Sequence, residues 1–148
     1  MMSLTAIDLW AVAPEIVVAT MACLVLVVDV YTRSVRPCAL AYPLTIGTLI
    51  AGAAISMMGL FEAPHLALNG LVIRDGVADF LKTGTCLATA VVLFYARDYA
   101  QERGLWRGEY LVLALFGVVG MMTMIGAAHL LTLYVGIELL ALCLYGMI

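Results

Sequence analysis

Five long apolar segments, joined by short polar stretches, constrain the fold of this chain more than any other feature. They cover about residues 10–30, 39–61, 77–96, 110–127 and 130–148. A helix of about 20 apolar residues crosses the hydrocarbon core of a bilayer, and these segments come close to that length. Because lipid offers no hydrogen bonds to the backbone, the sequence predicts an all-α integral membrane protein with five transmembrane helices in one membrane domain, residues 1–148.

The composition supports a membrane protein and excludes several other classes. The chain is 66% hydrophobic and 11% charged, whereas soluble domains are about 45–50% apolar and about 25% charged. Its net charge of −3 argues against a nucleic-acid partner. The N-terminus lacks a basic region and a small-residue cleavage site, so the first segment is expected to be a retained helix. No metal or cofactor site is predicted, because no Cys-x-x-Cys pair or Cys/His spacing occurs among Cys23, Cys38, Cys86 and Cys143.

The last apolar segment carries one carboxylate, Glu138, near its middle, and no other charge from Leu130 to Ile148. A lone acid at that depth costs about 2.5–3.5 kcal/mol on insertion scales, so it needs a proton or a partner. Acids within the membrane usually mark ion or substrate paths, and we therefore interpret Glu138 as a proton-relay carboxylate. The alternatives are a permanently protonated, hydrogen-bonded packing residue, or a residue near the lipid headgroups if the helix is shifted. Tyr134 and Tyr145 lie on the same helical stripe and could orient Glu138, but hydrogen bonds to other helices are the preferred role of their hydroxyls.

The other charges near the apolar segments have simpler explanations. Glu15 follows Pro14 at a helix start, where a carboxylate suits the positive end of the helix dipole. We expect Glu15 and Asp29 to lie at the membrane interfaces. Asp79 and Lys82, at i and i+3 in the third segment, can neutralise one another. Snorkelling of Lys82 to the membrane surface is the preferred explanation, and a polar role of Lys82 inside the protein is the alternative.

Small residues concentrate in the second segment, where they favour close helix packing. They are Gly47, Ala51, Gly52, Ala53, Ala54, Ser56 and Gly59.

The stretch 62–76 is not helical in pattern and contains Asn69-Gly70 between short apolar runs. This dipeptide suits a type I′ turn, which needs positive φ at both central residues. We therefore predict a small β-hairpin near residues 66–75, at the membrane surface. His65, without a second ligand in view, is interpreted as an interfacial histidine.

The distribution of lysine and arginine predicts the orientation in the membrane. The stretch 97–109 is expected to be the longest polar loop. Five basic residues lie in the loops after the first and third segments, against two on the opposite side (Arg33, Arg36, Arg97, Arg103 and Arg107 against Arg74 and Lys82). The positive-inside rule then places the N-terminus and the hairpin on the periplasmic side of a bacterial-type cytoplasmic membrane. The last segment ends without a polar tail, and the chain is expected to be a fragment of a longer polytopic subunit.

Several short motifs resemble a known family. They are Pro14-Glu15 opening a helix that closes on Asp29, then Asn69-Gly70, Arg74-Asp75-Gly76 with Phe80 and Lys82, Gly108-Glu109-Tyr110, and the Gly136-Ile-Glu138-Leu139 element with its flanks. Together they resemble the N-terminal portion of subunit N of proton-pumping NADH:quinone oxidoreductase (respiratory complex I), an antiporter-like membrane-arm subunit. The short leader with Pro-Glu favours N over the sister subunits M and L.

The resemblance implies a role in proton translocation coupled to electron transfer from NADH to quinone. It implies a subunit without a redox centre, with NADH, FMN, iron–sulfur clusters and quinone bound by other subunits, and other membrane-arm subunits as partners. Glu138 matches the family's intramembrane glutamate, which pairs with a lysine on a later helix. That lysine has no counterpart here, because the only lysine of this sequence is Lys82. The helices present correspond only to the start of the family's first inverted repeat.

Two other functions remain open at this point. One is a subunit of a multisubunit cation/proton antiporter that works without a quinone enzyme. The other is a structural or assembly subunit, in which Glu138 serves only to hold helices together.

Overall fold

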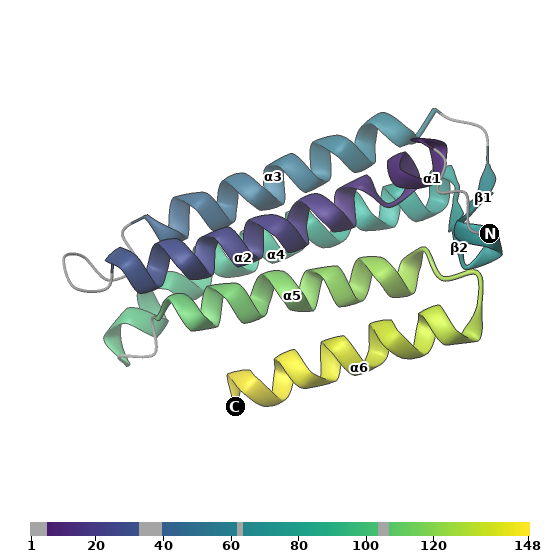
Figure 1. Ribbon diagram of the computed structural model, residues 1–148. Helices are drawn as coiled ribbons and strands as arrows, with labels where there is room; N and C mark the ends of the chain where they lie inside the picture. The colour runs from purple at the N-terminus through teal and green to yellow at the C-terminus, as the bar shows by residue number, and fades with distance from the viewer. Residues whose placement is uncertain (1–5, 33–39, 62–63, 104–106) are drawn as a thin grey trace.

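The computed structural model describes residues 6–32, 40–61, 64–103 and 107–148 and shows a bundle of long helices (Figure 1). The helices are α1 (Ala6–Ala11), α2 (Ala13–Thr32), α3 (Ala41–Gly59), α4 (Gly76–Glu102), α5 (Gly108–Ile125) and α6 (Leu130–Met147), with strands β1 (His65–Ala67) and β2 (Val72–Arg74) joined by the turn η1 (Leu68–Gly70). Among the described residues, five helices, α2 to α6, are long and apolar enough to cross a membrane. The predicted multi-pass membrane protein with five spans is confirmed.

Four of the long helices form a ring, and α6 lies outside it. Helix α2 packs against α3 and α5, and α4 packs against the same two helices, so that α2 and α4 occupy opposite corners. The core between them is apolar and includes Val18, Leu49, Leu115 and Met122. Helix α6 packs on α5 at the edge of the molecule (Figure 1).

Glycines bring α5 and α6 close together. A Cβ atom at Gly136 would lie 3.0 Å from the carbonyl oxygen of Gly120 and 2.6 Å from Cγ of Met124. A Cβ atom at Gly120 would lie 3.1 Å from the backbone nitrogen of Leu140. Small residues of this kind let two helix backbones approach in a membrane, and here they fix which face of α6 turns toward α5.

The predicted hairpin is present, with His65 opposite Arg74 and Ala67 opposite Val72. Asn69 has φ 56° and ψ 36°, Gly70 has φ 83°, and the amide of Leu71 donates to the carbonyl of Leu68 at 3.2 Å. These are the features of the expected type I′ turn. Leu68 also has a positive φ, 52°, which the sequence did not predict.

The hairpin is joined to the α5–α6 turn by backbone hydrogen bonds. Ile73 donates its amide to the carbonyl of Gly126 at 2.9 Å, and Ala128 donates to the carbonyl of Leu71 at 3.1 Å. The hydroxyl of Thr132, in the first turn of α6, donates to the same Leu71 carbonyl at 2.9 Å. One end of the bundle is therefore closed by a small hydrogen-bonded layer (Figure 1).

One predicted boundary is wrong. Residues 97–102 are not part of a polar loop, because α4 continues without a break to Glu102. Alanine, glutamine, glutamate and arginine are good helix formers, so polarity alone does not end a helix. The guanidinium of Arg97 lies over the ring of Tyr42, 4.9 Å from its centroid, and ties this extension to α3. The predicted loop residues Arg33, Arg36 and 104–106 lie outside the described residues.

Candidate functional site

The predicted relay residue, Glu138, lies on the outer face of α6. Its side chain is exposed, as are those of Tyr134 and Tyr145 on the same face. The residues of α6 that are buried, Gly136 and Cys143, lie on the opposite face toward α5. Tyr134 lies one helical turn before Glu138 on the same face, and the two side chains interact. Within the described residues Glu138 forms no ion pair, so the structure does not bring it together with a cation.

A second carboxylate, Glu15, lies inside the bundle and is paired with the only lysine. Lys82 Nζ lies 2.7 Å from Glu15 Oε1, and the two residues are 0% and 9% exposed. Glu15 is the third residue of α2, and Lys82 is six residues into α4, about 9 Å along the helix axis. The pair crosses between opposite corners of the ring, near the hairpin end.

Next to it lies a second buried ion pair, between Arg74 at the end of β2 and Asp79 in the first turn of α4. Arg74 Nε donates to Asp79 Oδ2 at 3.0 Å, and both side chains are almost completely buried. Arg74 Nη1 also donates to the carbonyl of Trp10 at 2.8 Å. The guanidinium therefore ties the hairpin to both α1 and α4.

The positions of Lys82 and Asp79 correct two predictions. Glu15, predicted to lie at a membrane interface, is near the start of α2 and is buried in the ion pair with Lys82, a partner that the sequence did not predict. Lys82 does not snorkel, since its side chain is fully buried. Asp79 and Lys82 do not neutralise one another, because Asp79 pairs with Arg74. Lys82 and Asp79, which are neighbours on α4, thus each pair with a residue of another element and not with one another.

Asp29, the other predicted interfacial acid, is buried near the end of α2. Its carboxyl group occupies the space that a Cβ atom at Gly108 would need. Gly108 is the first residue of α5, so the carboxylate lies at the positive end of that helix dipole.

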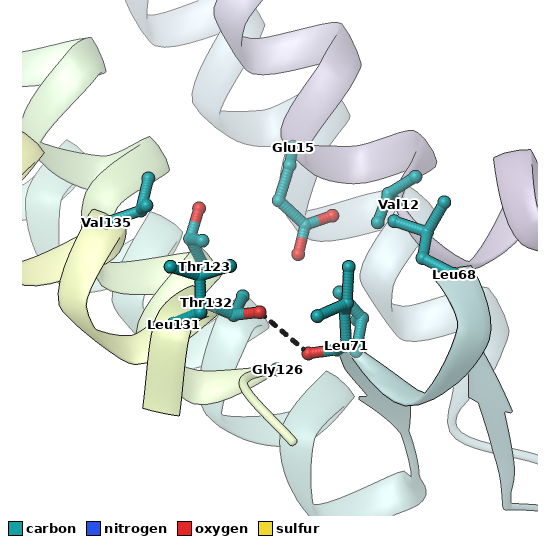
Figure 2. Close-up of a pocket in the computed structure, with 10 residues that line it drawn as sticks. Val12, Glu15, Leu68, Leu71, Thr123, Gly126, Leu131, Thr132 and Val135 are labelled. Carbon is teal, nitrogen blue, oxygen red and sulfur yellow. Dashed lines mark hydrogen bonds between the residues drawn. The ribbon is translucent and has the colours of Figure 1, made fainter. Parts of the chain in front are cut away.

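An apolar cavity of about 330 Å³ adjoins the Glu15–Lys82 pair. It lies between α2, the hairpin turn, and the facing ends of α5 and α6, and Figure 2 shows the carboxyl group of Glu15 pointing into it between the two threonines and Leu71. Its lining residues are Val12, Glu15, Leu68, Leu71, Val72, Thr123, Gly126, Leu131, Thr132 and Val135. Val135 lies one helical turn before Glu138, so the cavity extends from the start of α6 to the turn that precedes the predicted relay residue.

Curated proteins from several bacteria are similar to the chain. It is 47% identical over 135 residues to subunit N of NADH-quinone oxidoreductase from Thiobacillus denitrificans, covering 91% of this chain and 28% of the relative. The corresponding protein of Thioalkalivibrio sulfidiphilus is 43% identical over 141 residues, covering 95% and 29%. That of Laribacter hongkongensis is 37% identical over 147 residues, covering 99% and 30%.

Over nearly all of its length, the chain is similar to NADH-quinone oxidoreductase subunit N. This confirms the resemblance to subunit N that the sequence motifs indicated. The chain spans only 28–30% of the length of these subunit N relatives. No family model matches the chain.

The Glu15–Lys82 pair is the part of the site that sequence reasoning missed. A signal was available, because both residues fall near the beginning of segments that enter the membrane from the same side. Opposite charges near the same ends of parallel spans are candidates for pairing, even when neither lies on a recognisable motif.

Proposed function

We propose that this chain forms part of a membrane-arm subunit of NADH-quinone oxidoreductase that takes part in proton translocation, with Glu138 as a proton-relay carboxylate. The names of the relatives support this assignment over an antiporter that works without a quinone enzyme. In this proposal the chain carries no redox centre. NADH, FMN, iron–sulfur clusters and quinone belong to other subunits, and the other membrane-arm subunits are its partners.

The single observation that carries the relay role is the placement of Glu138. It lies in the middle of α6, a span with no other charge, on the face turned away from the bundle. A carboxylate there must hold a proton or meet a cation, and the described residues supply only a tyrosine hydroxyl. We infer that a cation outside the described residues faces Glu138 and alternates with a proton in neutralising it.

The mechanism follows from electrostatics at low dielectric. When the cation lies close to Glu138, the carboxylate is stabilised and releases its proton. When the cation moves away, the lone charge becomes too costly and the carboxylate takes up a proton. Energy from redox chemistry elsewhere in the complex would drive the change in that distance.

The experiment replaces Glu138→Gln in the complete complex and measures protons pumped per NADH oxidised in membrane vesicles. Glutamine keeps the size and polarity of the side chain but cannot exchange a proton. We expect assembled complex with loss of proton pumping. Glu102→Gln, an exposed carboxylate at the end of α4, is the matched control and should pump normally. Normal pumping by the Glu138→Gln complex would remove Glu138 from the relay and leave a packing role.

A further inference from the structure

The Glu15–Lys82 pair leaves polar atoms without partners in the interior of the bundle. Glu15 Oε2 is buried and accepts no hydrogen bond from the described residues, and Lys82 Nζ has the Glu15 carboxylate alone as its partner among them. Leaving a buried charged oxygen unsatisfied costs free energy, so such an atom usually meets an ordered water or takes part in chemistry.

The adjoining cavity supplies both the room and the polar atoms that a water needs. Its volume of about 330 Å³ holds several waters, each of which occupies about 30 Å³ in the liquid. The hydroxyl protons of Thr123 and Thr132 are already donated to the carbonyls of Val119 and Leu71. Their oxygens, together with Glu15 Oε2, are therefore acceptors, which suits water molecules that bring the donors.

Each other buried charge described near Glu15 has a partner of opposite charge. Helix α4 contributes Lys82 and, closer to the hairpin, Asp79, and β2 contributes Arg74, which is paired with Asp79. The groups that α5 and α6 turn toward the cavity are uncharged. Lys82 also lies against Gly126, where a Cβ atom would come within 3.3 Å of Nζ. Glu15 is thus the carboxylate that both faces the cavity and compensates Lys82.

We propose that Glu15 is a second proton-binding group of this chain, loaded and unloaded through water in the cavity at the hairpin end of α2, α5 and α6. A proton from the cavity water binds Glu15 Oε2, and Lys82 keeps its own proton. The pair then changes from net neutral to a single positive charge, and release of the Glu15 proton to the water restores the ion pair. This inference rests on the proposed role in proton translocation and places a loading site between Glu138 and the hairpin side of the membrane.

The first test needs no variant and no pumping. In the native complex, a hydrophobic carbodiimide should form an adduct at Glu15, because it reacts with carboxyl groups that become protonated in an apolar setting. Mass spectrometry of the digested subunit measures the adduct. Val12→Phe, which fills the cavity but keeps the acid, should lower the yield, whereas Val27→Phe on an exposed face of α2 should not. No adduct in the native complex, or equal yields in both variants, would overturn the proposal.

The second test separates proton binding from a purely structural ion pair. Glu15→Gln should lose pumping while NADH oxidation continues. The double variant Glu15→Lys with Lys82→Glu restores opposite charges, so it should assemble even if Glu15→Gln does not. Its carboxylate then belongs to α4 and no longer faces the cavity, and pumping should stay lost. A charge-swapped complex that pumps normally would show that the pair is structural.

These outcomes are distinguishable from failure of the Glu138 relay. If Glu138→Gln loses pumping but Glu15→Gln pumps normally, Glu15 is excluded as a proton-binding group and the Glu138 relay still stands. The reverse pattern would remove Glu138 from the path and leave Glu15 in place. A Glu15 adduct that depends on the cavity is measured independently of both.

Discussion

Glycines decide where the buried charges can lie. A Cβ atom at Gly59 would overlap both the guanidinium of Arg74 and the carboxylate of Asp79, so this ion pair can exist only beside a residue without a side chain. Gly108 stands in the same relation to Asp29. Both glycines were visible in the sequence as small residues near helix ends, but nothing in the sequence showed that they make room for charge.

Gly59→Ala is therefore expected to disturb the Arg74–Asp79 pair and destabilise the hairpin end by about 1–3 kcal/mol, the usual cost of overpacking a closely packed site. Thermal denaturation of the purified complex, followed through this subunit, measures the loss. Gly47→Ala, on the same helix but facing open space, is the control and should leave stability unchanged. If both variants denature at the same temperature, the Arg74–Asp79 pair is not disturbed when α3 moves to make room for the added methyl group.

The same residues show how far the sequence alone could be followed. Apolar length predicted the spans, and Asn69-Gly70 predicted the turn, because each depends on local chain properties. The partners of Glu15, Asp79 and Lys82 were missed, because helical spacing states which residues share a face and not which helix that face meets. The end of α4 was missed because polar helix formers were interpreted as a loop.

At the level of elements, α6 depends on one neighbour. Its contacts with the rest of the chain are made mainly with α5, along Gly120 and Gly136, and its other face carries Glu138 and the two tyrosines. The position of Glu138 is thus fixed by how closely α5 and α6 approach. Because Gly136, Leu140 and Cys143 lie toward α5, Glu138 and the two tyrosines lie on the outward face of α6.

Gly136→Ala is expected to move α6 away from α5, because the added methyl group would meet backbone atoms of Gly120 and Met124 that cannot rotate aside. We expect a loss of about 1–3 kcal/mol and a lower melting temperature of the complex. Gly84→Ala, on the open side of α4, provides the comparison and should melt like the native protein. An unchanged melting temperature for Gly136→Ala would show that α6 is held mainly by contacts outside this chain.

For the whole molecule, the burial of some cationic side chains bears on the orientation in the membrane that the lysine and arginine counts predicted. Among the described residues, Arg97, Arg103 and Arg107 lie at the end of the bundle away from the hairpin, while Arg74 and Lys82 at the hairpin end are buried in ion pairs. The hairpin end therefore exposes fewer cationic side chains to the headgroups than the sequence count suggested. This supports the proposed topology, with the N-terminus and the hairpin on the periplasmic side.

The orientation can be measured with single cysteines in a cysteine-free background of the complete complex. Leu66→Cys, exposed on β1, should react with a membrane-impermeant maleimide added from the periplasmic side. Gln101→Cys, exposed near the end of α4, should react only when the reagent reaches the cytoplasmic side. The opposite pattern would invert the topology, and with it the side from which the cavity beside Glu15 is filled.

The hydrogen bonds between β2 and the α5–α6 turn also have a consequence for biogenesis. The strand is synthesised well before the turn, and in the predicted topology both cross the bilayer before Ile73 and Gly126 can meet. Until then the edge groups of β2 have no partner on the turn. In that topology, insertion of α5 is the step that brings Gly126 to the strand and closes this end of the bundle.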